Sequence, residues 1–223
     1  MEGEAAHHLG RVLRAQTGQL YELSDGNSVW LGRIENVTRD SVGFVLTEQL
    51  VAYQPSLDIK LLLSVVKFDH FEWALEKATE LGVTIIVPLA AARSEKALLA
   101  AAEKRAERWK KILLEASQQS RRLRVPTLSE VTKPEKVFAE DDESLRVMLS
   151  ERVDARPMRE IFHGRSDKKA VLAIGPEGGW TDGEFEAARA GGFLEASLGR
   201  LILRTETAVI SALAALNYAL GED

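Results

Sequence analysis

A carboxylate and several glycines stand together in one turn of this sequence, "AIGPEGGWTDGEF" at residues 173–185. Glycine-rich turns that open a helix often hold phosphate, because their backbone N–H groups point at an anion. Glu177 argues against a phosphate here, since like charges about 4 Å apart repel by roughly 1 to 4 kcal/mol, depending on screening. The spacing also matches neither G-x-G-x-x-G nor a G-K-S/T phosphate loop. We therefore expect a cationic or zwitterionic ligand without phosphate, such as S-adenosylmethionine.

A second run of unusual residues, "LGRLILRTETA" at 198–208, follows another predicted strand. The first turn comes after a strand predicted at 169–175, and the second comes after one predicted at 193–198. In open parallel sheets, ligands bind where strands end and loops begin. We therefore expect the two loops to fold together into one pocket.

The elements that must position these loops alternate between strands and helices from residue 58 onward. Continuous apolar runs predict strands buried on both faces of a parallel sheet, and apolar residues at helical spacing predict the helices between them. The predicted strands cover residues 59–66, 83–89, 144–150, 169–175 and 193–198. The predicted helices cover residues 70–82, 94–121, 181–190 and 205–221, with a short helix and loop from 157.

The N-terminal residues 1–57 show a different pattern. Short runs of alternating apolar and polar residues are separated by "SDGN" and "TRDS", which is typical of β-strands joined by tight turns. We predict a small barrel or sandwich there, with a linker at 54–58. The sequence thus favours a small β domain followed by an α/β domain with a mostly parallel sheet.

Composition narrows the possible functions. The 223 residues include no cysteine, which excludes disulfides, a thiolate nucleophile and cysteine-ligated metals. The four histidines lack ligand-spaced partners, so we expect no metal site. Neither a run of about 18 apolar residues nor a signal peptide is present. We therefore expect a cytoplasmic protein that does not bind membranes.

The net charge of −5 is unevenly distributed. Residues 103–124 hold eight lysines or arginines against three glutamates, a local charge of +5, which leaves −10 for the remainder. Such a basic stretch on an acidic protein is typical of a nucleic-acid interface. A solvated helix face is an equally good interpretation.

The motifs at 173–185 and 198–216 together resemble the C-terminal signature of the SPOUT methyltransferases, specifically the RsmE family of ribosomal RNA uracil-N3 methyltransferases. Further matching stretches run upstream in the same order: "FEWALEKATELGV", "ARSEK", "EASQQSRRLRVP" and "AAHHLGRVLRAQTGQ". The resemblance therefore covers nearly the whole chain.

This resemblance implies a SPOUT-type, mostly parallel sheet with a C-terminal trefoil knot at residues 58–223. A PUA-like β-barrel that binds RNA would precede it at residues 1–57. The resemblance also implies S-adenosylmethionine as cofactor, 16S ribosomal RNA in the small ribosomal subunit as substrate, and a homodimer in which each site borrows residues from the partner.

The resemblance assigns three loops to the cofactor. The first follows a predicted strand, the second is the glycine turn that contains Glu177, and the third precedes the last helix. The residues carried over are Leu149, Ser150, Ile174, Gly175, Pro176, Glu177, Gly178, Leu198, Gly199, Leu203, Arg204 and Thr205.

Catalytic and RNA-binding roles are carried over to fewer residues. Methyl transfer to N3 of uracil requires the N3 proton to leave, and a cation such as Arg122 could stabilise the developing anion. Glu177 is a candidate base, although we favour a role in fixing its loop by accepting backbone hydrogen bonds. The predicted RNA contacts are His8, Arg11, Arg14, Arg93 and Arg122. Ordinary surface arginines are the alternative for Arg11 and Arg14.

Several positions depart from the family's pattern. Leu201 stands where arginine is usual, Arg121 where glycine is usual, and Ala92 where an acidic residue is usual. Arg122 is then the aligned substrate-side arginine, with Arg121 as an ambiguity. The family's first strand normally precedes the "HHL" segment and is lacking here, so we expect an N-terminal barrel that is incomplete or built differently.

Two other functions compete with this hypothesis. A nucleotide-dependent enzyme outside the SPOUT class would use the glycine turn to hold phosphate. A non-catalytic RNA-binding protein would keep the same fold without the chemistry.

Overall fold

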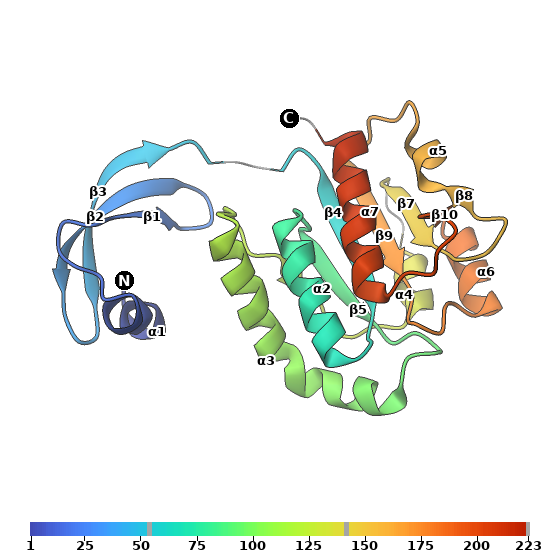
Figure 1. Cartoon of the computed structure of the whole chain (residues 1–223), viewed down its shortest axis with the longest axis horizontal. Helices are drawn as coiled ribbons and strands as arrows, with labels where there is room; N and C mark the ends of the chain where they lie inside the picture. The colour runs from blue at the N-terminus through green and yellow to red at the C-terminus, as the bar shows by residue number, and fades with distance from the viewer. Residues whose placement is uncertain (53–54, 141–142, 222–223) are drawn as a thin grey trace. The chain divides into compact units, whose positions relative to one another are not determined.

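The computed structural model describes residues 1–52, 55–140 and 143–221. The chain forms two compact units, one of residues 1–54 with 122–124 and the other of residues 55–121 with 125–223. Figure 1 labels the elements of both units. Gln54, the first residue of the predicted linker, lies outside the described residues. The segment Arg122–Arg124 thus belongs to the N-terminal unit although it follows a long helix of the other.

The N-terminal unit contains a three-stranded antiparallel sheet in the order β1-β2-β3. Its strands are β1 (Leu20–Ser24), β2 (Val29–Val37) and β3 (Val42–Leu50). Both predicted turns are present. In the first, the Ser28 and Asn27 N–H groups donate to the Asp25 carboxylate at 2.7 and 2.8 Å. These hydrogen bonds lower the pKa of Asp25.

Residues 3–12 are helical, which the prediction of β structure in residues 1–57 missed. The α-helix α1 (Gly3–His7) continues into the single π-helical turn η1 (His8–Val12). Ala6 and Leu9 are buried with Ile34 and Val42 of the sheet. Among the side chains described in this helix, Ala6 and Leu9 are the buried ones, too few to produce a recognisable helical period in the sequence.

The C-terminal unit is built on a seven-stranded sheet in which every strand pairs in parallel, in the order β6-β5-β4-β9-β7-β10-β8. The prediction of an α/β domain with a parallel sheet is therefore confirmed. The strands are β4 (Asp58–Ser64), β5 (Ile85–Leu89), β6 (Thr127–Leu128), β7 (Leu145–Leu149), β8 (Arg156–Pro157), β9 (Lys169–Ile174) and β10 (Leu194–Ser197).

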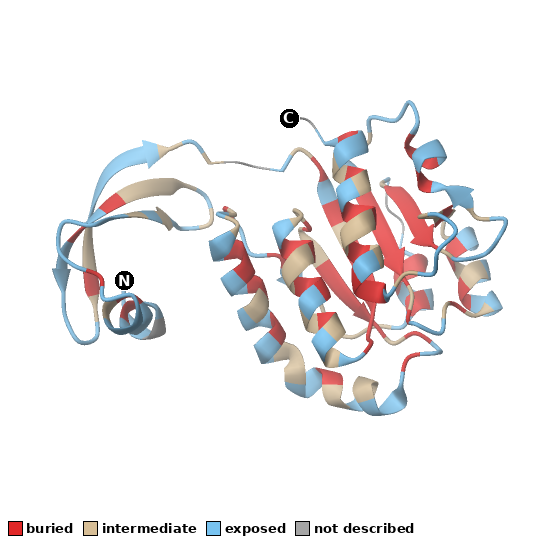
Figure 2. Cartoon of the chain, in the orientation of Figure 1, coloured by how far each residue is buried: buried red, intermediate tan, exposed pale blue. Residues whose placement is uncertain are grey.

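Helices cover both faces of this sheet, with the strands buried between them (Figures 1 and 2). The side chains of one face pack against α2, α3, α5 and α7, and those of the other face pack against α4 and α6. The helices are α2 (Phe68–Glu80), α3 (Lys96–Gln119), α4 (Pro134–Phe138), α5 (Met158–Phe162), α6 (Asp182–Ala190) and α7 (Thr205–Leu220).

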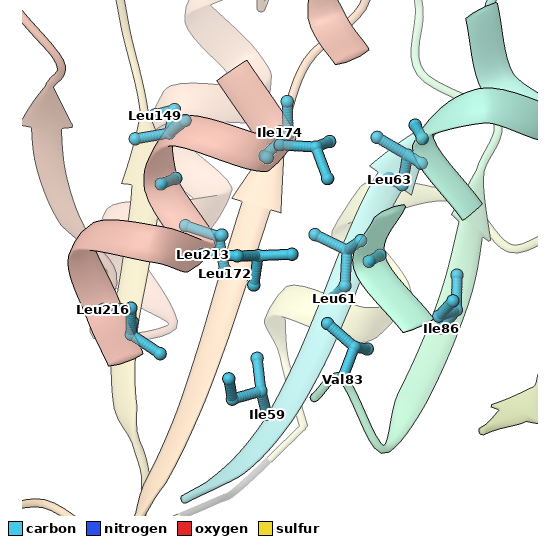
Figure 3. Close-up of a cluster of buried hydrophobic side chains, with 14 of the residues drawn as sticks. Ile59, Leu61, Leu63, Val83, Ile86, Leu149, Leu172, Ile174, Leu213 and Leu216 are labelled. Carbon is cyan, nitrogen blue, oxygen red and sulfur yellow. The ribbon is translucent and has the colours of Figure 1, made fainter. Parts of the chain in front are cut away.

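Successive side chains of the central strands point to opposite faces of the sheet, which divides the core into two layers. Leu61 and Leu63 of β4 join the cluster beneath α2 and α7, whereas Leu62 joins the opposite cluster. Figure 3 shows Leu61 beside Leu172 of β9, and Leu63 across from Ile174 on the same two strands. Each such fully buried side chain contributes about 1.5 to 3 kcal/mol. This packing holds the carboxyl ends of the strands in fixed positions.

A buried arginine ties α4 to the chain that follows α6. The Arg146 guanidinium donates to the backbone carbonyls of Glu140 and Gly191 at 2.8 and 2.6 Å, and to those of Val137 and Phe138 at 3.3 and 3.2 Å. It therefore satisfies carbonyls at the C-terminal end of a short helix, which lack partners within that helix.

The close approach at this point requires glycine at Gly191. A Cβ on Gly191 would lie 2.0 Å from the carbonyl oxygen of Phe138. The guanidinium of Arg146 also stacks 4.4 Å from the ring centre of Phe193. None of these contacts could be predicted from the sequence, because Arg146 stands in a strand that otherwise reads as purely apolar.

Candidate active site

A cavity of about 340 Å³ opens at the carboxyl ends of β7, β9 and β10. Three loops form its walls: the residues after β7, the glycine turn after β9, and the loop between β10 and α7. The residues that line it are Arg93, Leu149, Ser150, Glu151, Arg152, Ile174, Gly175, Pro176, Glu177, Gly179, Trp180, Asp182, Phe185, Ser197, Leu198, Gly199, Leu201, Ile202, Leu203, Thr205 and Ala208. The expectation that the two late loops share one pocket is met.

Ten of the twelve residues predicted to hold a cofactor line this cavity, and two do not. Gly178 lines a neighbouring hollow instead. Arg204 is exposed and provides the N-cap backbone of α7. Within the described residues, Arg204 borders neither cavity.

Trp180 links two of the loops that form the cavity. Its indole Nε1 donates to the carbonyl oxygen of Leu149 at 3.0 Å, which links the glycine turn to the end of β7. A Cβ on Gly175 would lie 3.0 Å from the Trp180 ring. Trp180 is buried, so it packs beneath the turn while its edge reaches the cavity.

Glu184 fixes the far end of the same turn. The predicted capping box is present, with the Thr181 N–H and hydroxyl donating to Glu184 Oε2 at 2.8 Å. The other carboxylate oxygen accepts a hydrogen bond from the Ala92 N–H at 2.9 Å. The capping box was evident in the sequence, but the bond to Ala92 spans 92 residues and was not.

Replacing Glu184 with alanine is expected to destabilise the protein by about 2 kcal/mol, because the N–H groups of Ala92 and Thr181 lose the buried carboxylate that accepts their hydrogen bonds. Urea denaturation measures the change. The matched control is Glu186→Ala, which removes an exposed carboxylate from the same helix and should leave stability within about 0.5 kcal/mol. Equal stabilities of the two variants would contradict this role for Glu184.

Arg93 and Glu177 both line the cavity. Arg93 Nη1 donates to the carbonyl oxygen of Gly178 at 2.7 Å. Glu177 is exposed, and its carboxylate accepts no hydrogen bond within the described residues. The favoured interpretation of Glu177, that it fixes the loop by accepting backbone hydrogen bonds, therefore has no support from the geometry, and Glu184 has that role instead.

Family models match both parts of this chain. A model described as an RNA methyltransferase domain matches residues 53–217, and one described as an RNA methyltransferase PUA domain matches residues 2–46. Ribosomal RNA small subunit methyltransferase E of Synechocystis is 35% identical, over 95% of this chain and 70% of that protein. The protein of the same name from Bacillus subtilis is 31% identical, over 97% and 88%.

The chain belongs to the ribosomal RNA small subunit methyltransferase E family. A crystal structure of a family protein from Neisseria gonorrhoeae bound to S-adenosylmethionine has a TM-score of 0.90 and 29% identity, covering 99% of this chain and 91% of that one. A methyltransferase from Legionella pneumophila with bound cofactor has a TM-score of 0.87 and 32% identity, with the same coverage. The resemblance recognised in the sequence is thus confirmed.

The other predicted contacts of this family member lie in its N-terminal unit. His8, Arg11 and Arg14 are all exposed within one short stretch. Arg122 is partly buried, and burial lowers the pKa of its guanidinium. Its neighbour Arg124 donates to the turn between β1 and β2, through bonds to Gly26 and Asn27 at 2.8 and 3.0 Å.

The basic stretch at 103–124 is partly used within the fold. Arg105 and Arg108 of α3 pair with Glu72 of α2 at 3.4 and 2.8 Å, and Lys110 pairs with Glu107 at 2.8 Å. These three pairs lie within the C-terminal unit. The local charge of +5 therefore overstates the free positive charge that α3 offers to a nucleic acid.

Several lining residues were not predicted as site residues. Glu151, Arg152, Asp182 and Phe185 belong to the walls that the loops after β7 and β9 build. Their spacing in the sequence carries no cofactor signal, because only the parallel arrangement of the strands brings them together. Leu201, which departs from the family's usual arginine, is 82% exposed at the rim.

Among residues 1–52, 55–140 and 143–221, no three histidine, cysteine, aspartate or glutamate side chains gather in a way that could hold a metal ion. Over the same ranges, no helix is both long and apolar enough to cross a membrane.

Proposed function

We propose that this chain is an S-adenosylmethionine-dependent methyltransferase that methylates N3 of a uridine in 16S ribosomal RNA. The observation that carries the proposal is the cavity at the ends of β7, β9 and β10, bounded by the two glycine-containing loops. Family relatives are named for ribosomal RNA methylation, and the similar structure from Neisseria gonorrhoeae holds S-adenosylmethionine.

The residues of the cavity fit this cofactor in charge and size. Three carboxylates line it, those of Glu151, Glu177 and Asp182, against the two cations Arg93 and Arg152. Such a balance suits a sulfonium with a zwitterionic amino-acid end better than it suits a pyrophosphate. A volume of about 340 Å³ lies within the range of small-molecule sites.

The contribution of the chain to the chemistry is first of all positioning. Bound S-adenosylmethionine supplies an electrophilic methyl group. The loops must hold its sulfonium in line with N3 of the base, and such alignment alone can contribute several kcal/mol. A neighbouring cation stabilises the uracil anion that develops as N3 loses its proton. We assign that role to Arg122, presented to the site of a partner chain in a homodimer.

The remaining assignments concern the RNA and the assembly. We infer that the PUA-like unit binds RNA backbone through His8, Arg11 and Arg14, which would orient the RNA without reading its sequence. We also infer that the loops around the cavity are threaded in a trefoil knot. The working form is a cytoplasmic homodimer that acts on the small ribosomal subunit.

Incubating the protein with S-adenosylmethionine and small subunits that lack this modification tests the proposal. Mass spectrometry of the digested RNA should detect N3-methyluridine at one position. Absence of methyl transfer despite S-adenosylmethionine binding would favour the non-catalytic RNA-binding alternative. Methylation of another atom would contradict the assigned specificity.

Replacing Arg122 with alanine is expected to lower kcat of methyl transfer by about 100-fold, because the developing anion loses a cation held in a partly buried setting. Binding of S-adenosylmethionine, measured by calorimetry, should not change. Arg189→Ala is the matched control, since Arg189 is an exposed arginine on α6 that lines neither cavity. Equal kcat values for Arg122→Ala and the wild type would exclude a catalytic role for Arg122.

A further inference from the structure

A second, smaller cavity of about 180 Å³ lies at the carboxyl end of β4, which is the neighbour of β9 in the sheet. It is formed by the residues after β4, the start of α3 and the glycine turn after β9. The residues that line it are Val65, Val66, Lys67, Arg93, Ser94, Glu95, Leu98, Pro176, Glu177 and Gly178.

The two cavities adjoin each other. Arg93, Pro176 and Glu177 line both of them. A group held in the smaller cavity would therefore lie beside a molecule held in the larger one. Within the described part of the chain, Glu177 is the one carboxylate that borders both cavities, because Glu95 borders only the smaller.

The charged groups of the smaller cavity have few partners in the protein. Lys67, Glu95 and Glu177 make no side-chain hydrogen bond or ion pair within the described ranges. The carboxylate of Glu72 on the nearby helix α2, by contrast, binds two arginines. The smaller cavity thus combines unpaired donors and acceptors with apolar walls from Val66, Leu98 and Pro176.

From this arrangement we propose that the smaller cavity receives the target uracil and that Glu177 accepts its N3 proton. The proposal rests on the methyltransferase function proposed above. A base flipped out of its RNA strand is commonly read by hydrogen bonds to its edge and by packing against its faces. Lys67 and Arg93 can donate to the two uracil carbonyl oxygens, and the apolar residues can pack against the ring.

The methyl transfer is a nucleophilic displacement in which N3 of the uracil attacks the methyl carbon and the thioether sulfur leaves. The N3–H bond breaks and its proton moves to the Glu177 carboxylate, which becomes the neutral acid. The electron pair left on N3 forms the new N3–C bond to the methyl carbon. The C–S bond breaks as this bond forms, and its electron pair stays on sulfur, which leaves neutral S-adenosylhomocysteine. Glu177 later returns the proton to water.

Two other occupants of the smaller cavity fit less well. An RNA phosphate in the smaller cavity would face two carboxylates, those of Glu95 and Glu177. Their negative charges would repel the phosphate. The amino-acid end of the cofactor does not need the smaller cavity, because the larger cavity already offers charged groups of both signs.

The substitution Glu177→Gln tests the proton acceptor. It keeps the shape of an exposed side chain, so the melting temperature should not change. S-adenosylmethionine affinity should fall by at most about tenfold, because two other carboxylates remain in the larger cavity. At neutral pH kcat should fall by at least about 100-fold, the usual contribution of a general base. Activity should recover as the pH becomes alkaline, because uracil then loses its N3 proton without help. Glu186→Gln, which changes an exposed carboxylate on α6, is the control and should retain wild-type kcat.

The outcomes separate this inference from the function on which it rests. If the wild type neither binds S-adenosylmethionine nor methylates RNA, the proposed function fails, and the inference fails with it. If the wild type is active and Glu177→Gln matches it in kcat and in pH dependence, the proton-acceptor role alone is overturned.

The substitution Leu98→Trp tests the acceptor cavity by filling it from α3. We expect kcat/KM for RNA to fall by at least about tenfold while the dissociation constant for S-adenosylmethionine stays the same. Leu114→Trp is the control, because Leu114 is an exposed leucine of the same helix. A parallel loss of S-adenosylmethionine affinity in Leu98→Trp would show that the cofactor occupies the smaller cavity. Unchanged RNA kinetics would show that the base binds elsewhere, and either result overturns the assignment.

Discussion

Replacing Ala208 with tryptophan is expected to raise the dissociation constant for S-adenosylmethionine by at least about 1,000-fold, or about 4 kcal/mol of binding free energy. Ala208 lies in the first turn of α7 and lines the larger cavity. The indole would occupy volume that the cofactor needs, and a well-packed core beneath α7 leaves little room for it to turn inward. Titration calorimetry measures the loss, and methyl transfer should fall with it.

The control for this substitution lies on the same helix. Ala214→Trp places an equal side chain on an exposed position of α7, so it should bind S-adenosylmethionine as the wild type does. The melting temperatures of both variants must be measured, so that loss of binding is separated from loss of folding. If Ala208→Trp is folded and binds the cofactor normally, the cofactor does not occupy this cavity.

Replacing Arg146 with methionine is expected to have the largest effect on stability, a loss of roughly 3 kcal/mol in the free energy of unfolding. The change keeps most of the apolar stem but removes the donors that serve the carbonyls of Phe138, Glu140 and Gly191. Hydrogen bonds from a charged donor contribute about 1.5 to 3 kcal/mol, and acceptors left buried without a partner add a cost. Urea denaturation at neutral pH measures the change.

Arg156→Met is the matched control, because Arg156 is an exposed arginine on an edge strand of the same sheet. It should change stability by no more than about 0.5 kcal/mol. If Arg146→Met were as stable as Arg156→Met, the four carbonyls would not depend on the guanidinium, and α4 would be held by its apolar contacts alone.

The elements that carry a long apolar period could be predicted from the sequence. Phe71, Leu75 and Ala78 of α2 are buried as their helical spacing indicates, and Gly82 follows this helix with φ of +92°. Val209 and Leu213 of α7 are likewise buried. Short elements were missed, because the two-residue strands β6 and β8 and the five-residue α4 are too brief to show any period.

The loops around the larger cavity could be located because their chemistry is local. Glycine, proline and Glu177 stand within a few consecutive residues, and the strands that precede the loops are strongly apolar. The hydrogen bonds that position these loops are not local. The bond from Ala92 to Glu184 and the bond from Trp180 to Leu149 join residues far apart in the chain, so no sequence window contains both partners.

The unit to which Arg122 belongs also could not be predicted from the sequence. The sequence puts it just after a long helix of the C-terminal unit, whereas the fold groups Arg122–Arg124 with the N-terminal unit. Leu123 is buried and its carbonyl accepts a bond from Ser24 at 3.2 Å. A segment of only three residues is too short for its composition to show that it belongs to the other unit. The contacts in the structure are needed to show this.

Titration calorimetry of the wild-type protein with S-adenosylmethionine, S-adenosylhomocysteine, ATP and NAD tests the central claim most directly. We predict that the first two ligands bind one site per chain and compete with each other, while ATP and NAD neither bind nor displace them. Binding of ATP or NAD without binding of S-adenosylmethionine would contradict the account, because the cavity between the two glycine loops would then be a phosphate site.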